Sequence, residues 1–383
     1  MITIKNAKVL YGMEMEVRKL NIIIHDHEIV ELTARGSEGK IIDGQHCLAV
    51  PTLINSHVHI GDSVAKDLGD GEPIDRIVKP PDGIKHRILS ETPPEEIVSS
   101  MQNSMKEMLQ TGTTTFVDFR EGGLNGIEMI EKASENIPIR KIVLGRQESF
   151  HNSENLVEIK EATIDILNQC EGVGLSGFGE IKDEIASIIA ETCREKGKLS
   201  AIHVAEYLKL QTESMKLKGK TEIQRAINAG FKLLIHMTAP IEDDLELVGK
   251  SDVTVISCPR SNGSLSVGIP PLKEMIDNGV NVALGTDNIM FNSPNMFHEM
   301  EYALKVSRGF YRTYISPLEI FKMATVTPAN ALGLETGWIE EGKIADLMLI
   351  KGVSGDPILS IINRTRSKNI KALIKDGAIV FGG

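Results

Sequence analysis

Strand-like and helix-like segments alternate through the middle of the chain, and this regularity limits the possible folds more than any other feature. Helical patterns such as EEIVSSMQNSMKEMLQTG and DEIASIIAETCREKG end at Gly, as helices often do. Eight alternating strands predict an α/β fold, a (β/α)8 TIM-like barrel, and fit it better than a six-stranded open sheet. The strand candidates are CLAVPTLINSH, TTTFVDF, IRKIVLG, GVGLSGFG, LSAIHV, FKLLIHM, VTVISC and VNVALGTD.

The two ends of the chain differ from the middle because both are rich in short strands. MITIKNAKVL and KLNIIIHDHEIVEL near the start, and IKALIKDGAIVFGG at the end, show β-branched alternation around polar turns. We therefore predict that residues 1–50 and 339–383 pair into one small β-sandwich domain. Residues 51–338 would form the catalytic barrel domain.

Charge and composition exclude several classes of partner. The net charge is −11 and the pI is about 5.5, so no overall positive field favours nucleic acid. The four cysteines are scattered and form no CxxC pair, which indicates buried thiols in a reducing compartment. The start lacks the features of a signal peptide, and no apolar run is long enough to cross a membrane. We expect a cytoplasmic protein without nucleic-acid or membrane partners.

Five metal-competent side chains occupy the ends of four of the predicted strands. His57 and His59 end the first strand, His203 the fifth, His236 the sixth and Asp287 the eighth. Active sites of such barrels lie at the carboxyl ends of the strands. Residues i and i+2 of a strand share a face, so the first pair can reach one ion. A single strand-end His is usually not a ligand, but five such residues rarely coincide by chance.

A second histidine pair, His25 and His27, has the same spacing but no matching residues on other strands. Asp26 lies between the two, where a hairpin turn is expected. We interpret this HDH sequence as a solvent-exposed turn.

Glu206 lies three residues after His203, just beyond a strand end. A carboxylate beside a metal ion can take a proton from water and deliver it to a substrate. The alternative is a Glu at a helix start, where the helix dipole favours negative charge.

The segments SHVH, HVAE, LIHMT, SCPRSNGSL and VNVALGTDN resemble those of the amidohydrolase superfamily. The likeness is to its deaminase and chlorohydrolase branch, which includes cytosine deaminase, S-adenosylhomocysteine deaminase and atrazine chlorohydrolase. GWIEEGKIADLMLI resembles the return of that family's chain into its β-sandwich, so the likeness spans nearly the whole chain.

The resemblance implies a metal-dependent active site. One divalent metal ion, zinc or iron, would be bound by His57, His59, His203 and Asp287. Glu206 would be the proton shuttle and His236 would lie beside the bound hydroxide, while Asp287 would also help to deprotonate the water. Ser261 and Asn262 match a motif that shapes the mouth of the site, although a tight turn and a helix cap explain them equally well.

The predicted fourth strand departs from the pattern of the two-metal members, which carry a carboxylated lysine at its end. Glu180 is nearest to that place, and Lys182 lies two residues further on. This favours a single metal ion and leaves Glu180 as a possible substrate contact.

The resemblance implies hydrolytic deamination of a small heterocycle by a homodimer. A metal-bound hydroxide would attack an amidine-like ring carbon, and ammonia would leave. A cyclic amide hydrolase of the imidazolonepropionase type is the alternative, since its ligand set is the same. A non-catalytic scaffold is disfavoured because every metal position is intact, and a chlorohydrolase is a narrow offshoot of the deaminases.

Loop residues are the candidates for substrate binding. Cations around the mouth can hold a carboxylate or phosphate, or be ordinary solvated charges. Gln147 or Glu121 can instead read a heterocycle edge through paired hydrogen bonds. The candidates are Glu121, Arg146, Gln147, Glu180 and Asn288, and the further charged residues near the mouth are Arg76, Lys79, Lys85, His86, Arg87 and Arg120.

Overall fold

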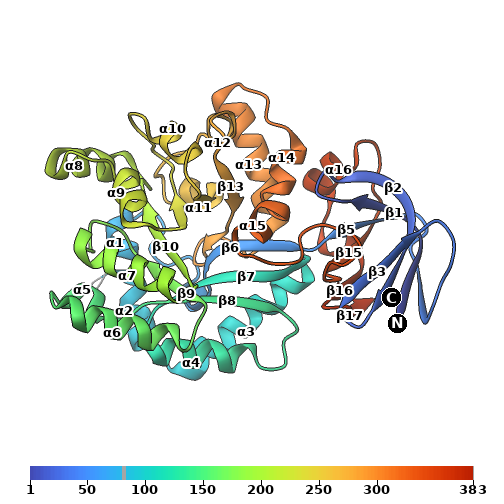
Figure 1. The fold of residues 1–383 in the computed structure, drawn as a ribbon, viewed down its shortest axis with the longest axis horizontal. Coiled ribbons are helices and arrows are strands. Elements are labelled where there is room, and N and C mark those ends of the chain that lie inside the picture. The colour runs from blue at the N-terminus through green and yellow to red at the C-terminus, as the bar shows by residue number, and fades with distance from the viewer. Residues whose placement is uncertain (80–82, 383) are drawn as a thin grey trace.

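A curled parallel sheet forms the centre of the protein (Figure 1), for which the computed structural model describes residues 1–79 and 83–382. All neighbouring strands of this sheet are parallel, and most are consecutive in the chain. The eight predicted strand segments are all present. In spatial order the strands are β13 (Asn281–Leu284), β12 (Thr254–Ser257), β11 (Leu233–His236), β10 (Leu199–Val204), β9 (Gly172–Leu175), β8 (Arg140–Gly145), β7 (Thr113–Arg120), β6 (Leu53–His59) and β14 (Asp287–Asn288).

The predicted barrel is not completed as a closed ladder in the described part of the chain. The eighth strand is interrupted, since β13 pairs with β12 whereas only the two-residue β14 pairs with β6. At the interruption, hydrogen bonds from the Asn55 side chain join β6 to the chain between β13 and β14. The Asn55 side chain accepts from the Thr286 N–H (2.9 Å) and donates to the Thr286 hydroxyl (2.7 Å). Gly285 lies so near His57 that a Cβ would be 2.7 Å from the His57 backbone nitrogen.

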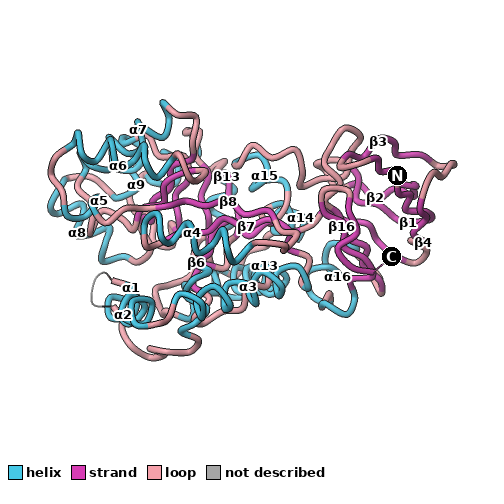
Figure 2. Tube along the Cα trace, turned by 90° about the horizontal axis from the view of Figure 1, so that it is seen from below, coloured by secondary structure: helices cyan, strands magenta, loops and turns pink. Residues whose placement is uncertain are grey.

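Helices follow the strands and cover the outer face of the curled sheet (Figures 1 and 2). Both helices predicted in detail are present, and each is followed by a left-handed glycine, Gly112 and Gly197. The helices of this part are η1 (Ile60–Ala65), α1 (Ile74–Val78), α2 (Ile84–Glu91), α3 (Pro94–Gln110), α4 (Gly123–Ser134), α5 (Ser149–Asn152), α6 (Leu156–Leu167), α7 (Asp183–Glu195), α8 (Leu208–Lys218), α9 (Glu222–Ala229), α10 (Asp244–Gly249), α11 (Pro259–Ser264), α12 (Leu272–Asp277), α13 (Met296–Tyr311), α14 (Pro317–Lys322) and α15 (Val326–Ala331).

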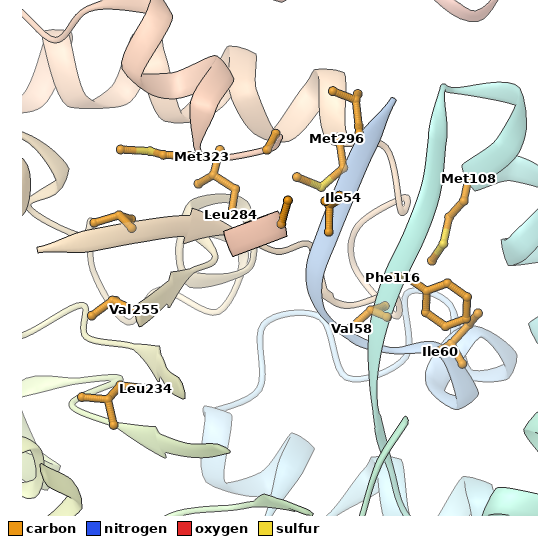
Figure 3. Close-up of a cluster of buried hydrophobic side chains, with 14 of the residues drawn as sticks. Ile54, Val58, Ile60, Met108, Phe116, Leu234, Val255, Leu284, Met296 and Met323 are labelled. Atoms are coloured by element: carbon orange, nitrogen blue, oxygen red, sulfur yellow. The ribbon is translucent and has the colours of Figure 1, made fainter. Parts of the chain in front are cut away.

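Two apolar layers lie on the two faces of this sheet. Ile54, Val58 and Phe116 belong to the outer layer, between strands and helices, part of which Figure 3 shows. Val117 and Phe119 belong to a smaller cluster formed by alternate residues of several strands. Because side chains alternate along a strand, this second cluster lies on the inner, concave face.

The strands near both chain ends pair with each other, as predicted, through the antiparallel β5–β15 ladder. They form one mixed sheet rather than the two sheets of a sandwich, because β5 pairs with both β1 and β15. Figure 2 shows this sheet at the opposite end of the molecule from α8. Its elements are β1 (Ile2–Tyr11), β2 (Glu16–His25), β3 (Glu28–Thr33), β4 (Lys40–Asp43), β5 (Cys47–Pro51), β15 (Leu347–Lys351), β16 (Ile370–Lys375) and β17 (Ala378–Gly382), with α16 (Pro357–Arg364) and η2 (Ser367–Asn369) between β15 and β16.

Two smaller predictions are also confirmed. The HDH sequence forms the exposed turn between β2 and β3, where Asp26 has a left-handed φ of 51°. All four cysteines are buried and free. In the described residues, no helix combines the length and the apolar character that crossing a bilayer requires.

Candidate active site

The five side chains predicted from strand ends lie together on the inner side of the curled sheet. The ring centroids of His57 and His59 are 4.9 Å apart, and those of His57 and His203 are 5.0 Å apart. The His236 ring lies 5.2 Å from that of His203. Asp287 completes the group, with Oδ1 3.1 Å from Nε2 of His57 and 3.6 Å from Nε2 of His59.

Two of these residues reach the group only because the backbone departs from regular strand geometry. Leu234 lies in the outer apolar layer, so regular alternation would send His236 to the same face. His236 instead has a φ of 76°, and Asp287 has a φ of 54°. Left-handed conformations are unfavourable for residues other than glycine and concentrate at functional sites. The surrounding packing therefore holds both side chains in strained but useful positions.

A hydrogen bond holds one ring nitrogen of His203 and one of His59. Nδ1 of His203 bonds to the Leu175 carbonyl oxygen at 2.7 Å, and Nδ1 of His59 lies 3.1 Å from Oε1 of Glu121. Such bonds at one ring nitrogen fix a metal-binding histidine and expose the other nitrogen. Nδ1 of His57 is buried and has no hydrogen-bond partner in the described residues. Imidazole and carboxylate ligands suit a divalent ion such as zinc or iron. Two overlapping groups have candidate ligand atoms within 4.8 Å of one another: His57, His59 and Asp287, and His57, His203 and His236.

The short helix α11 orients two of the predicted side chains. The Ser261 hydroxyl donates to Oδ2 of Asp287 at 2.5 Å, and the Asn262 amide donates to Nδ1 of His236 at 3.2 Å. Nε2 of His236 then faces Glu206, with 3.5 Å between Nε2 and Oε1. Ser261 and Asn262 thus do more than form a turn, because each contacts a polar side chain of the site.

The electrostatics of the site separate the two carboxylates. Burial raises the pKa of Glu206 well above its usual range, and the charges of Asp287 and Glu222 raise it further. Burial opposes ionisation of Asp287 too, but the hydrogen bond to His57 and the proximity of His236 hold its pKa well below the usual range. Burial also lowers the pKa of His236 to about 4. Asp287 is therefore ionised and His236 neutral at pH 7, while Glu206 holds a proton more readily than an ordinary glutamate.

A pocket opens above this group, with a volume of about 140 Å³. This is close to an engineered cavity of about 150 Å³ that binds benzene, so a single ring fits. Of the predicted substrate contacts, Arg146, Glu180 and Asn288 line the pocket. Oε2 of Glu180 is buried and has no hydrogen-bond partner in the described residues, and burial raises the pKa of this carboxyl group.

Two other predicted contacts lie away from the pocket lining. Gln147 packs against Gly123: a Cβ atom added to Gly123 would lie 2.7 Å from Oε1 of Gln147. Glu121 is buried beneath the pocket wall, where Oε1 is 2.9 Å from Nη2 of Arg146 and 2.6 Å from Nζ of Lys85. Burial opposes ionisation of Glu121, but Lys85 and Arg146 hold its pKa well below the usual range. Glu121 thus supports His59.

The buried ion pair of Lys85 and Asp62 was not predicted from the sequence. Nζ of Lys85 lies 2.9 Å from Oδ2 of Asp62, and both side chains are almost fully buried. Lys85 lies in α2, in a segment that is rich in basic residues. No feature of the neighbouring sequence distinguishes it from a cation exposed to solvent. The buried Arg120 also joins this network, with Nη2 3.2 Å from Oε2 of Glu121.

The remaining loop charges behave in different ways. Arg87 is exposed and Arg76 forms an exposed pair with Glu72, whereas Lys79 lines the pocket. Nε2 of His86 lies 2.9 Å from the Val78 carbonyl oxygen. Residues 80–82 of the same basic loop lie outside the described residues.

Lys182, near the end of the fourth strand, is exposed and pairs with Glu154. It therefore lies away from the grouped histidines, as expected from the sequence.

Comparison with known proteins agrees with this arrangement. A candidate aminohydrolase of Methanothermobacter thermautotrophicus is 48% identical over 382 residues, covering 99% of each chain. The 5-methylthioadenosine/S-adenosylhomocysteine deaminase of Pyrococcus furiosus is 29% identical over 402 residues, covering 99% of this chain and 94% of that protein. The crystal structure of an atrazine chlorohydrolase from Arthrobacter aurescens complexed with zinc has a TM-score of 0.86 at 19% identity, covers 100% of this chain and 95% of that chain, and shows the shared fold.

The family assignment rests on coverage as well as identity. The sequence model of the amidohydrolase family matches residues 48–380, which include the whole curled sheet and, from the second sheet, β15, β16 and most of β5 and β17. The chain is also nearly half identical to a relative of the same length. This protein therefore belongs to the amidohydrolase family.

Proposed function

We propose that the protein is a metal-dependent hydrolytic deaminase that releases ammonia from a small heterocycle. Membership of the amidohydrolase family and the deaminase among its relatives support hydrolysis of a C–N bond. The observation that carries the proposal is the convergence of four candidate ligands with Glu206 and His236. The four proposed ligands are His57, His59, His203 and Asp287. The ligand atoms lie within 4.8 Å of one another in each of three overlapping groups, which are His57, His59 and Asp287; His57, His203 and His236; and Glu206, His236 and Asp287.

Those four side chains would hold one divalent ion, zinc or iron. When bound, the ion would supply Lewis-acid chemistry and lower the pKa of water toward about 7. The low pKa of Asp287 supports this assignment, because metal ligands act in their deprotonated form. Glu121 would not contact the ion itself. It would support the site through its hydrogen bond to His59, which fixes the orientation of the His59 ring.

Glu206 would move the proton in this reaction. It takes a proton from the attacking water, and the hydroxide adds to an amidine-like carbon of the ring. The protonated Glu206 then delivers its proton to the leaving amine, the tetrahedral adduct collapses, and ammonia departs. The raised pKa of Glu206 suits the second of these transfers. His236, held by Asn262, would polarise the substrate or orient the water.

The pocket lining narrows the proposed substrate contacts. Oε2 of Glu180 has no hydrogen-bond partner among the described residues, and the nearest basic nitrogen there is Nδ1 of His151 at 3.9 Å, so it suits an N–H or O–H donor of the ring or its substituent. Arg146 and Asn288 line the same pocket. We propose residues 51–338 as the catalytic domain, with residues 1–50 and 339–383 as its supporting β-domain.

Ammonia release tests this function. Protein loaded with zinc or iron would be given purines, pyrimidines, pterins, adenosyl compounds, and guanidino or imidazole rings. Ammonia from one class, lost in Glu206→Gln and kept in Glu213→Gln, would support the proposal. Glu213 is a matched control because it lies on the nearby α8 and is exposed. Ring opening without ammonia would replace deamination by cyclic amide hydrolysis.

A further inference from the structure

Ala205, the residue before Glu206, has an unusual backbone conformation. It is fully buried, and its φ of 51° lies in the left-handed region. A residue with a Cβ adopts this conformation only when its surroundings impose it. The chain leaves β10 at this point, so the conformation of Ala205 decides where the next side chain lies. The groups that hold Ala205 therefore also control Glu206.

Both backbone polar groups of Ala205 have defined partners. Its N–H donates to Oε2 of Glu222 at 2.8 Å, and its carbonyl oxygen accepts from the Ala239 N–H at 2.9 Å. The second bond joins neighbouring strand ends, whereas the first depends on a single side chain. Glu222 lies in the first turn of α9, which is next to β10 (Figure 1). Removing its carboxylate would leave a buried N–H without an acceptor.

Glu222 is itself held firmly. Its side chain is 3% exposed, and its backbone N–H donates to Oε1 of Gln211 at 2.8 Å. Thr221 precedes it and forms a capping box with Gln224, which fixes the start of α9. A buried carboxylate in the first turn of a helix usually needs no further explanation. Here, however, it turns away from its own helix to bind the backbone of the β10 end.

We propose that Glu222 is a positioning residue. It holds Ala205 in its left-handed conformation and so places the Glu206 side chain beside His236. This rests on the proposed role of Glu206 as the proton shuttle. Without the Glu222 acceptor, Ala205 relaxes toward an extended conformation and Glu206 moves away from His236. A misplacement of about 1 Å in a catalytic group can lower turnover about 100-fold.

Three variants separate positioning from a merely structural role. Glu222→Ala should lower kcat about 100-fold with KM within about threefold, because substrate binding does not need Glu206 in place. Glu222→Gln keeps an oxygen acceptor for the Ala205 N–H, so kcat should stay within about tenfold of the wild type. Gln224→Ala loosens the same helix start without touching Ala205, and should leave kcat within about threefold.

Hydrogen exchange gives a readout that does not depend on activity. The peptide covering residues 203–207 should exchange faster in Glu222→Ala than in Glu222→Gln or Gln224→Ala, with zinc content unchanged. Unchanged exchange and kcat in Glu222→Ala would overturn the proposal, as would equal losses in Glu222→Ala and Gln224→Ala. If the wild type deaminates nothing, the proposed function fails, but the exchange comparison still decides whether Glu222 holds Ala205.

Discussion

The replacement Ser261→Ala tests whether Asp287 acts as a metal ligand oriented by α11. The Ser261 hydroxyl is buried and donates to Oδ2 of Asp287 at 2.5 Å, while Oδ1 of Asp287 faces His57 and His59. The variant removes this one bond and leaves the carboxylate in place. Asp287 then loses both a donor to its charged form and a restraint on its rotation.

The magnitude follows from that single bond. A hydrogen bond to a charged group is worth about 1.5–3 kcal/mol, or roughly 10- to 150-fold in an equilibrium constant. Loss of a partner that orients a metal ligand typically lowers metal affinity about 10- to 100-fold. Both routes predict that the zinc dissociation constant of Ser261→Ala rises about 10- to 100-fold.

Competition with a chromophoric chelator, starting from metal-free protein, measures this constant. Ser257→Ala is the matched control, because Ser257 is fully buried at the end of β12 and its hydroxyl oxygen has no hydrogen-bond partner in the described residues. It should change the zinc dissociation constant less than about threefold. Equal zinc affinity in the wild type and Ser261→Ala would refute the reasoning.

Three further predictions concern catalysis and stability. Glu206→Gln should lower kcat by about 10²- to 10⁴-fold with zinc content unchanged, measured by ammonia release and metal analysis. Lys85→Met removes the ion-pair partner of the buried Asp62 and should lower the free energy of unfolding in urea by about 3–5 kcal/mol, whereas the exposed Arg87→Met should change it by less than about 0.5 kcal/mol. Burial raises the pKa of Glu299 from 4.5 to about 7. The stabilisation that the protein gains from the protonated Glu299 carboxyl group is therefore fully present below pH 4.5 and is lost as the pH rises through 7. Relative to Glu299→Gln, the wild type should therefore lose about 3 kcal/mol of unfolding free energy between pH 4.5 and 7, and equal pH profiles would contradict this.

The strands and their terminal histidines could be predicted because both signals are local. His57 and His59 are two residues apart on β6 and share its inner face, although the register of β6 shifts between Asn55 and Val58; His203 shares the inner face of β10 with Ala201. The strand-end rule then brings them to one edge of the sheet. The closure of the sheet could not be predicted in this way, because the Asn55 side chain replaces a backbone ladder there.

The orientation of His236 marks the limit of alternation. By parity with Leu234 its side chain belongs on the outer face, and only its left-handed backbone brings it inward. The prediction that His236 belongs to the site was therefore correct, but alternation along the strand does not explain it. A non-glycine residue with positive φ leaves no local sequence signal, since the surrounding packing imposes it.

The supporting residues could not be predicted because their partners are distant in the sequence. Lys85 pairs with Glu121 across the site, and Glu222 bonds to the backbone of Ala205 from another element. In the sequence, Lys85 resembles any loop cation and Glu222 any acidic residue in a first helical turn. Only the tertiary arrangement distinguishes them from solvated charges.

The stoichiometry of ammonia release tests the central claim most directly. Zinc-loaded protein would be incubated with the heterocycle that it consumes, and ammonia would be measured alongside the loss of the amino-substituted ring. A hydrolytic deaminase predicts one ammonia for each ring consumed, with an intact ring that carries a carbonyl group, and no turnover in Glu206→Gln. Consumption without ammonia, or full turnover in Glu206→Gln, would contradict the account.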